Sequence, residues 1–88
     1  MTTKDRSAIA REAVFAVLAR IAPELAPAAI APDKPLRDQV DLDSMDWLNV
    51  LVALHEQLGV DIPEADYGRL VTLDDIVAYL QEKLPAGT

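Results

Sequence analysis

Two serines and one histidine are the candidates for nucleophilic chemistry in this sequence, because it contains no cysteine. The serines are Ser7 and Ser44, and the histidine is His55. If Ser44 and His55 share one helix, their separation along its axis is about 16 Å, far beyond the hydrogen-bonding reach that a Ser–His pair requires. The sequence also lacks a glycine-rich phosphate loop and paired histidine ligands. We therefore expect no catalytic residue and predict that the chain is not itself an enzyme.

Aspartates surround Ser44, at positions 41, 43 and 46. Clustered carboxylates can bind calcium, but an EF-hand loop starting at Asp41 would need glycine in place of Asp46 and glutamate in place of Val52. The sequence therefore predicts no dedicated metal site. Taken alone, the dipeptide Asp43-Ser44 is an ordinary helix start. After these exclusions, however, Ser44 remains the one candidate for a functional site.

Helical spacing of apolar residues dominates the chain. It predicts three longer helices, over about residues 4–21, 44–58 and 72–84, and one brief helix over 63–69. Between the first two lies a long loop with four prolines, which is unusual in a compact domain unless the loop is functional or contains a short turn of its own. Its apolar residues could anchor it over the core: Leu25, Ile30, Leu36, Val40 and Leu42. The expected fold class is all-α.

Local signals support these boundaries. Pro23 ends the first helix. Asp43 stands at an N-cap position before the second helix, and Gly59 supplies its C-terminal stop. Thr72 with Asp75 resembles a capping box at the start of the last helix, which Pro85 closes.

Composition and charge limit the classes of partner that we expect for this chain. Half of the residues are hydrophobic, enough for one compact core, and the charged N-terminal segment and short apolar runs predict neither a secretion signal nor a membrane helix. Residues 1–37 carry a net charge of +2, whereas residues 38–75 carry −9. Such an acidic half disfavours nucleic acid and anionic lipid and favours proteins with basic patches. We expect a cytoplasmic, monomeric domain without stable membrane insertion.

The second predicted helix has two apolar faces when residues are placed at 100° per step. The side expected to face the core comprises Trp47, Val50, Leu51, Leu54 and Leu58. A second group, which we call the apolar strip, comprises Met45, Leu48 and Val52, with His55 at its edge. A small helical domain cannot easily bury both sides of one helix. Either the long loop covers the apolar strip, or a partner protein docks on it.

Three segments resemble the acyl carrier protein family. Residues 36–46 (LRDQVDLDSMD) are similar to the family's phosphopantetheine attachment segment, whose core reads Asp-Ser-Leu. Residues 54–63 (LHEQLGVDIP) resemble the end of the family's second helix and its Ile-Pro turn, and residues 72–80 (TLDDIVAYL) resemble its last helix. The resemblance covers roughly residues 34–84, while the first helix fits by pattern and position only.

The resemblance implies a four-helix bundle with a long first loop and a site at Ser44. A phosphopantetheinyl transferase would join coenzyme A's 4'-phosphopantetheine to the Ser44 hydroxyl, and the thiol of that arm would carry acyl groups as thioesters. The transferase would recognise Asp43 and contact Met45. Acyl-loading and acyl-processing enzymes with basic and apolar patches would dock on the second helix. We expect four residues of this helix to form the docking surface: Asp46, Leu48, Val52 and Glu56.

The sequence departs from the family pattern at several positions. Met45 replaces the usual leucine, a volume-conserving change, and Asp41 stands where many members have glycine. Asn49, His55 and Gln57 interrupt the acidic run of the second helix. These departures suggest a specialised, bacterial-type carrier for fatty-acid, lipid or polyketide-type biosynthesis.

Two alternatives remain open. One is an aminoacyl or peptidyl carrier, which shares the arm and its attachment chemistry, although the acidic balance disfavours it. The other is an unmodified helical adaptor that uses the apolar strip for binding, with Ser44 only starting a helix. In each case we expect residues 1–88 to form a single domain, with an ordered core over about 4–84.

Overall fold

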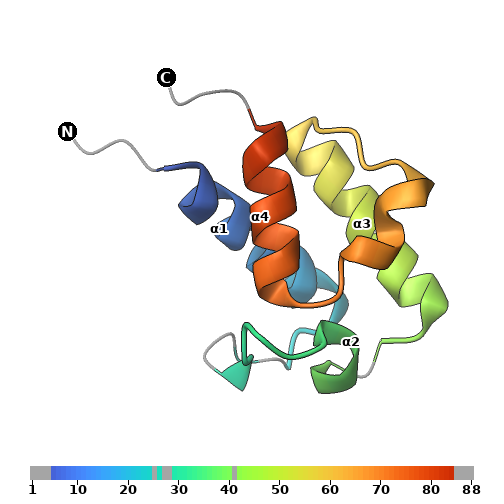
Figure 1. Ribbon diagram of the computed structural model, residues 1–88. Helices are drawn as coiled ribbons and strands as arrows, with labels where there is room; N and C mark the ends of the chain where they lie inside the picture. The colour runs from blue at the N-terminus through green and yellow to red at the C-terminus, as the bar shows by residue number, and fades with distance from the viewer. Residues whose placement is uncertain (1–4, 25, 27–28, 41, 85–88) are drawn as a thin grey trace.

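Helices joined by loops surround the core of the protein (Figure 1). This computed structural model describes residues 5–24, 26, 29–40 and 42–84. Along the chain the elements are α1 (Arg6–Ile21), α2 (Leu36–Gln39), α3 (Ser44–Leu58), the 3-10 helix η2 (Glu64–Arg69) and α4 (Leu73–Lys83). Within those residues there is no strand, and one isolated bridge pairs Pro35 with Thr72. The all-α prediction is confirmed.

Helix α1 is capped at both ends by local hydrogen bonds. At its start the Asp5 carboxylate accepts a hydrogen bond of 2.8 Å from the Ala8 backbone N–H, so the helix begins at Arg6 rather than near residue 4. At its end the Ala22 N–H donates to the Leu18 carbonyl over 2.7 Å, directly before Pro23. Apolar residues at helical spacing form its inner face, and four of them are buried: Ala10, Val14, Val17 and Leu18. Ile21, on the same face, is half-buried against the core.

The long loop contains a short helix of its own, α2, whose bounds the sequence did not predict. Gln39 holds the loop together, because its side-chain oxygen accepts from the Ala31 N–H over 2.6 Å and its amide group donates to the Ala31 and Lys34 carbonyls. Four of the expected anchors are buried: Ile30, Leu36, Val40 and Leu42. The fifth, Leu25, lies outside the described residues. The loop is therefore packed onto the bundle.

Backbone hydrogen bonds also tie this loop to Val71, before α4, and to the first turn of α4. The Leu36 N–H donates to the Val71 carbonyl over 2.9 Å, and the Asp74 N–H donates to the Pro32 carbonyl over 3.0 Å. These contacts hold the middle of the loop, at Pro32 and Leu36, against the start of α4.

The remaining helices follow the predicted signals. Gly59 has the left-handed φ of 68° that lets glycine end α3. Thr72 and Asp75 form a reciprocal capping box at the start of α4. The brief helix is confirmed as the 3-10 helix η2, which begins after Pro63. Pro85, expected to close α4, lies outside the described residues.

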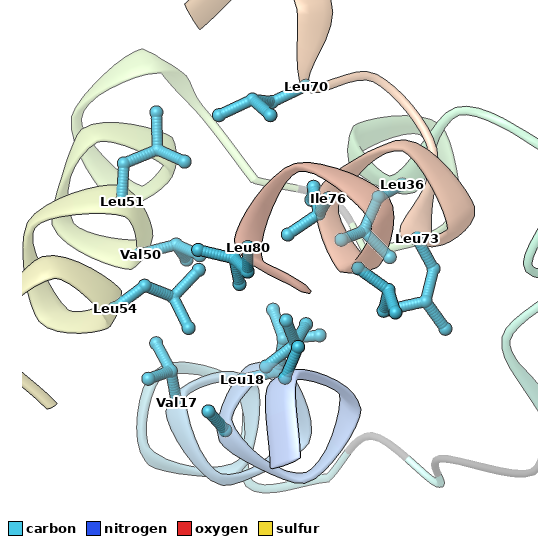
Figure 2. Packing of buried hydrophobic residues seen from close by; sticks show 14 of the residues in the cluster. Val17, Leu18, Leu36, Val50, Leu51, Leu54, Leu70, Leu73, Ile76 and Leu80 are labelled. Atoms are coloured by element: carbon cyan, nitrogen blue, oxygen red, sulfur yellow. The ribbon is translucent and has the colours of Figure 1, made fainter. Parts of the chain in front are cut away.

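Side chains from α1, α3 and α4 converge on one apolar core (Figure 2). Helix α3 contributes four buried residues, Trp47, Val50, Leu51 and Leu54, while Leu58 is half-buried against them. The predicted core face of α3 is therefore correct. Since this face is fixed by packing, the opposite sides of α3 are turned away from the core.

Candidate functional site

Ser44 is the first residue of α3 and is exposed to solvent. The Asp43 carboxylate accepts a hydrogen bond of 2.8 Å from the Asp46 N–H, and the Asp43 carbonyl accepts one of 2.9 Å from the Trp47 N–H. These bonds satisfy backbone donors of the first turn and fix where the helix begins. The buried Leu42 and Trp47 hold the same segment from either side. The Ser44 side chain is thus presented outward from a rigid start.

The two serines differ in their hydrogen bonding. The Ser7 hydroxyl donates to the Asp5 carboxylate over 2.8 Å, and Ser7 is half-buried. Together with the stronger influence of the Ala8 N–H, this bond holds the pKa of Asp5 below its usual value. The Ser44 hydroxyl has no hydrogen-bond partner among the described residues. Of the two serines, Ser44 therefore has the hydroxyl that is free to be modified.

The apolar strip is exposed, which answers the question that the sequence left open. Met45 is 68% exposed, Leu48 42% and Val52 48%, so the long loop does not cover them. Glu56 is exposed one turn beyond Val52, and the half-buried Asp46 follows Met45. The structure therefore places three apolar side chains and two carboxylates on the solvent side of the helix that Ser44 starts.

Two grooves run beside α3, which the sequence did not reveal. The Trp47 groove, of about 410 Å³, lies between the long loop and η2 and is lined by Pro35, Arg37, Asp38, Leu42, Trp47, Tyr67, Gly68, Leu70 and Val71. The His55 groove, of about 400 Å³, lies between α3 and η2 and is lined by Leu51, Val52, His55, Asp61, Ile62, Pro63 and Tyr67. Tyr67 lines both grooves. These grooves are formed by residues from separate segments, so no local sequence pattern marks them.

His55 does not assist Ser44. Because α3 is continuous between them, the two residues are about 16 Å apart along the helix axis, as expected from the sequence. The Nδ1 atom of His55 instead lies 2.6 Å from the Val60 carbonyl oxygen and donates a hydrogen bond to it. His55 thereby ties the end of α3 to the segment that follows.

The acidic residues near Ser44 were considered above as metal ligands. Across the described part of the chain, no group of three or more His, Asp or Glu side chains could hold a metal ion. Asp41, the first residue of the calcium loop considered above, lies outside that part.

Among the described residues, no helix is both long enough and apolar enough to cross a membrane.

The described residues thus form a helical bundle that presents an exposed serine at the start of α3. Comparison with known proteins identifies the class. Residues 12–80 match the family described as phosphopantetheine attachment site, and the chain belongs to this family. Such a domain is the site of covalent 4'-phosphopantetheine attachment, and its members are carriers rather than enzymes.

Curated relatives are acyl carrier proteins. The chain is 35% identical over 78 residues to the meromycolate extension acyl carrier protein of Mycolicibacterium smegmatis, covering 85% of this chain and 79% of that protein. It is 38% identical over 72 residues to the acyl carrier protein of Renibacterium salmoninarum, covering 78% of this chain and 89% of that protein. The family resemblance inferred from the sequence is thereby confirmed.

A solved structure shows the same fold. It is the solution structure of a protein from Anaplasma phagocytophilum that has been assigned as an acyl carrier protein. The two chains superpose with a TM-score of 0.71 at 25% identity, over 98% of this chain and 96% of that one. The chain is therefore an acyl carrier of the helical-bundle type, which acts with a phosphopantetheinyl transferase and with acyl-processing enzymes.

Proposed function

We propose that Ser44 is the residue to which 4'-phosphopantetheine is attached, through a phosphodiester on its hydroxyl. The observation that carries this proposal is the difference between the two serines: the Ser44 hydroxyl is exposed and has no partner among the described residues, whereas Ser7 is half-buried and bonded to Asp5. The helix start suits a phosphate, because the N–H groups and dipole of the first turn favour negative charge there. The arm's terminal thiol would supply the nucleophilic sulfur that this cysteine-free chain lacks.

We infer roles for the residues on either side of Ser44. Asp43 fixes the helix start through its cap and presents a carboxylate that the transferase can read. Met45, 68% exposed, offers the transferase an apolar contact.

We propose that partner enzymes dock on the exposed side of α3. Leu48 and Val52 would supply apolar contact area. Asp46 and Glu56 would attract basic patches of the partner and fix its orientation on the helix. Weak docking is sufficient, because a short flexible tether holds the acyl thioester at an effective concentration of roughly millimolar. The chain would act as a monomer in the cytoplasm, with residues 1–88 forming one carrier domain.

A specialised role in lipid biosynthesis fits the relatives and the surface of α3. Two uncharged residues, Asn49 and Gln57, lie exposed on this helix, where an acidic run would suit a general carrier. The M. smegmatis relative is a meromycolate extension carrier, which supports a lipid pathway over the aminoacyl or peptidyl alternative. Free exchange with a general fatty-acid carrier in a reconstituted elongation assay would contradict this specialisation.

Intact-protein mass spectrometry tests the attachment site. The parent, Ser44→Ala and Ser7→Ala proteins are incubated with coenzyme A, magnesium and a promiscuous phosphopantetheinyl transferase. We expect a gain of one phosphopantetheine in the parent and in Ser7→Ala, and none in Ser44→Ala. Modification of Ser44→Ala would assign the arm to another residue. A folded parent that several transferases leave unmodified would favour the unmodified adaptor.

A further inference from the structure

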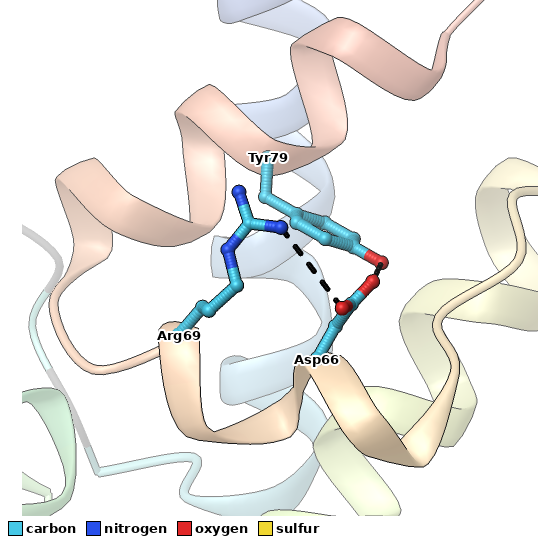
Figure 3. Close-up of polar contacts among 3 residues, drawn as sticks. All are labelled: Asp66, Arg69 and Tyr79. Atoms are coloured by element: carbon cyan, nitrogen blue, oxygen red, sulfur yellow. Dashed lines mark hydrogen bonds and ion pairs between the residues drawn. The ribbon is translucent and has the colours of Figure 1, made fainter.

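The two short helices, η2 and α2, are held by side-chain hydrogen bonds from different sources. For η2 the donor comes from a long helix, since the Tyr79 hydroxyl of α4 donates to the Asp66 carboxylate over 2.7 Å (Figure 3). For α2 the bonds come from its own last residue, Gln39. Helix α2 buries a single residue, Leu36. Apolar burial alone therefore gives α2 little support, and the bonds of Gln39 contribute the rest.

Gln39 uses both ends of its side-chain amide, and all of its partners are backbone atoms. Its Oε1 atom accepts from the Ala31 N–H over 2.6 Å, and its Nε2 atom donates to the Ala31 carbonyl over 2.9 Å. The same Nε2 atom donates to the Lys34 carbonyl over 3.0 Å. Gln39 is half-buried, where a lost bond is not fully replaced by water. We call this set of bonds the Gln39 clamp.

The part of the loop that the Gln39 clamp holds is itself fixed on α4. Pro32 directly follows Ala31, and its carbonyl accepts a hydrogen bond of 3.0 Å from the Asp74 N–H. The Gln39 clamp therefore joins the last residue of α2 to a segment that is anchored on the bundle.

Helix α2 lies beside the start of α3, where the candidate attachment residue is placed. Arg37 and Asp38 of α2 line the same groove as Trp47 of α3. Gln39 itself lines a further groove together with Asp46 of α3. Because Arg37 and Asp38 are exposed, a protein that reaches the start of α3 also meets α2.

We propose that Gln39 is a positioning residue for the modification of Ser44: its clamp holds α2 beside the start of α3, so that the phosphopantetheinyl transferase meets one ordered surface. This role rests on the proposed attachment at Ser44. Without the Gln39 clamp, α2 has to be ordered when the transferase binds, which weakens binding. Asp43 caps α3 independently, so the Ser44 hydroxyl stays in place for the chemical step. The Gln39 clamp therefore acts on KM for the carrier and leaves kcat unchanged.

Transferase kinetics on full-length variants test this role. Gln39→Met keeps the length of the side chain and removes all of its hydrogen bonds. Gln81→Met is the matched control, because Gln81 of α4 is also half-buried and has no partner among the described residues. We expect KM to rise about tenfold at unchanged kcat in Gln39→Met, and neither constant to change in Gln81→Met. Gln39→Glu keeps an acceptor for Ala31 but cannot donate, so its KM should also rise at unchanged kcat.

Gly59→Ala separates positioning from a general loss of stability. Gly59 has a φ of 68°, which strains alanine, although an added Cβ atom meets nothing within 4 Å. This variant therefore destabilises the far end of α3 and leaves α2 alone, and we expect its KM to equal that of the parent. An equal rise in KM for Gly59→Ala and Gln39→Met would overturn the positioning role. An unchanged KM in Gln39→Met, or a fall in kcat alone, would do the same.

Backbone amide hydrogen exchange on the unmodified chain tests the Gln39 clamp without the transferase. The Ala31 amide loses its acceptor in Gln39→Met and should exchange roughly tenfold faster. The Val40 amide, which donates to the Leu36 carbonyl over 3.0 Å, should also exchange faster as α2 loosens. The core amides of α1, α3 and α4 should keep their rates. Unchanged rates at Ala31 and Val40, or equal acceleration of the core amides, would overturn the Gln39 clamp.

Mass spectrometry of the parent and Ser44→Ala proteins distinguishes failure of the positioning role from failure of the attachment site. Modification of the parent but not of Ser44→Ala, with KM equal in the parent and Gln39→Met, would overturn the positioning role alone. Modification of Ser44→Ala would overturn the attachment site and, with it, the role of Gln39 toward Ser44.

Discussion

The Asp43 carboxylate accepts a hydrogen bond of 2.8 Å from the Asp46 backbone N–H, and this bond spans Ser44. One side chain therefore fixes the helix start and also places a negative charge beside the candidate attachment residue. These two contributions can be separated, because asparagine caps a helix about as well as aspartate but carries no charge.

We predict that Asp43→Ala lowers the free energy of unfolding by about 1 kcal/mol, because the Asp46 N–H loses its capping partner. Asp43→Asn should leave stability within about 0.5 kcal/mol of the parent. If the transferase reads the carboxylate, both variants should nevertheless lower kcat/KM for modification of Ser44. Urea denaturation and initial rates of phosphopantetheine transfer provide the two readouts. Full activity of Asp43→Asn would assign Asp43 a purely structural role.

We predict that Val52→Ser weakens docking without weakening the fold. Val52 is 48% exposed, and serine and valine have similar helix propensity, so the free energy of unfolding should change by less than about 0.5 kcal/mol. Loss of its apolar contact with an acyl-loading enzyme should raise KM for the carrier about fivefold, which corresponds to roughly 1 kcal/mol.

Val71→Ser provides the matched control for Val52→Ser. Val71 is 44% exposed but lies in the segment before α4, away from the apolar strip. Kinetics of acyl loading on the phosphopantetheine-bearing form of both variants should therefore show an effect for Val52 alone. An equal rise in KM for the two variants, or no rise for either, would contradict docking on the apolar strip.

Most helices could be predicted because their signals are local. The start of α3 follows from the capping residue Asp43, its end from Gly59, and the start of α4 from the Thr72–Asp75 pair. The two faces of α3 follow from helical periodicity, and the exposure of the apolar strip is consistent with the docking alternative.

The features that the sequence did not reveal depend on contacts between distant residues. Helix α2 is only four residues long, and its segment is held by Gln39 and by hydrogen bonds to residues at and just before the start of α4. Asp66 and Tyr79 are separated by 13 positions and belong to different helices. Periodicity and capping report neither kind of contact, so only the folded arrangement shows that Tyr67 lines two grooves.

The buried Tyr79 hydroxyl predicts a pH dependence of stability. Burial, followed by the hydrogen bond to Asp66, raises the pKa of Tyr79 to about 12, whereas a tyrosine in an unfolded chain titrates near 10. Between these values the unfolded chain loses a proton that the folded chain retains. Stability should therefore be unaffected by this group below about pH 10 and should fall as the pH rises from about 10 to about 12.

Urea denaturation across this range, on the parent and on Tyr79→Phe, isolates the contribution of Tyr79 from those of other titrating groups. The difference in free energy of unfolding between the parent and Tyr79→Phe should be constant below about pH 10, and the parent's greater stability should shrink above it.

In Tyr67→Phe, Tyr79 is the one remaining tyrosine, so the ultraviolet absorbance of tyrosinate reports its titration directly. A midpoint near 10 in the folded Tyr67→Phe protein would show that the hydroxyl is neither desolvated nor bonded to Asp66. A difference in free energy of unfolding between the parent and Tyr79→Phe that stays constant to pH 12 would contradict the predicted pH dependence.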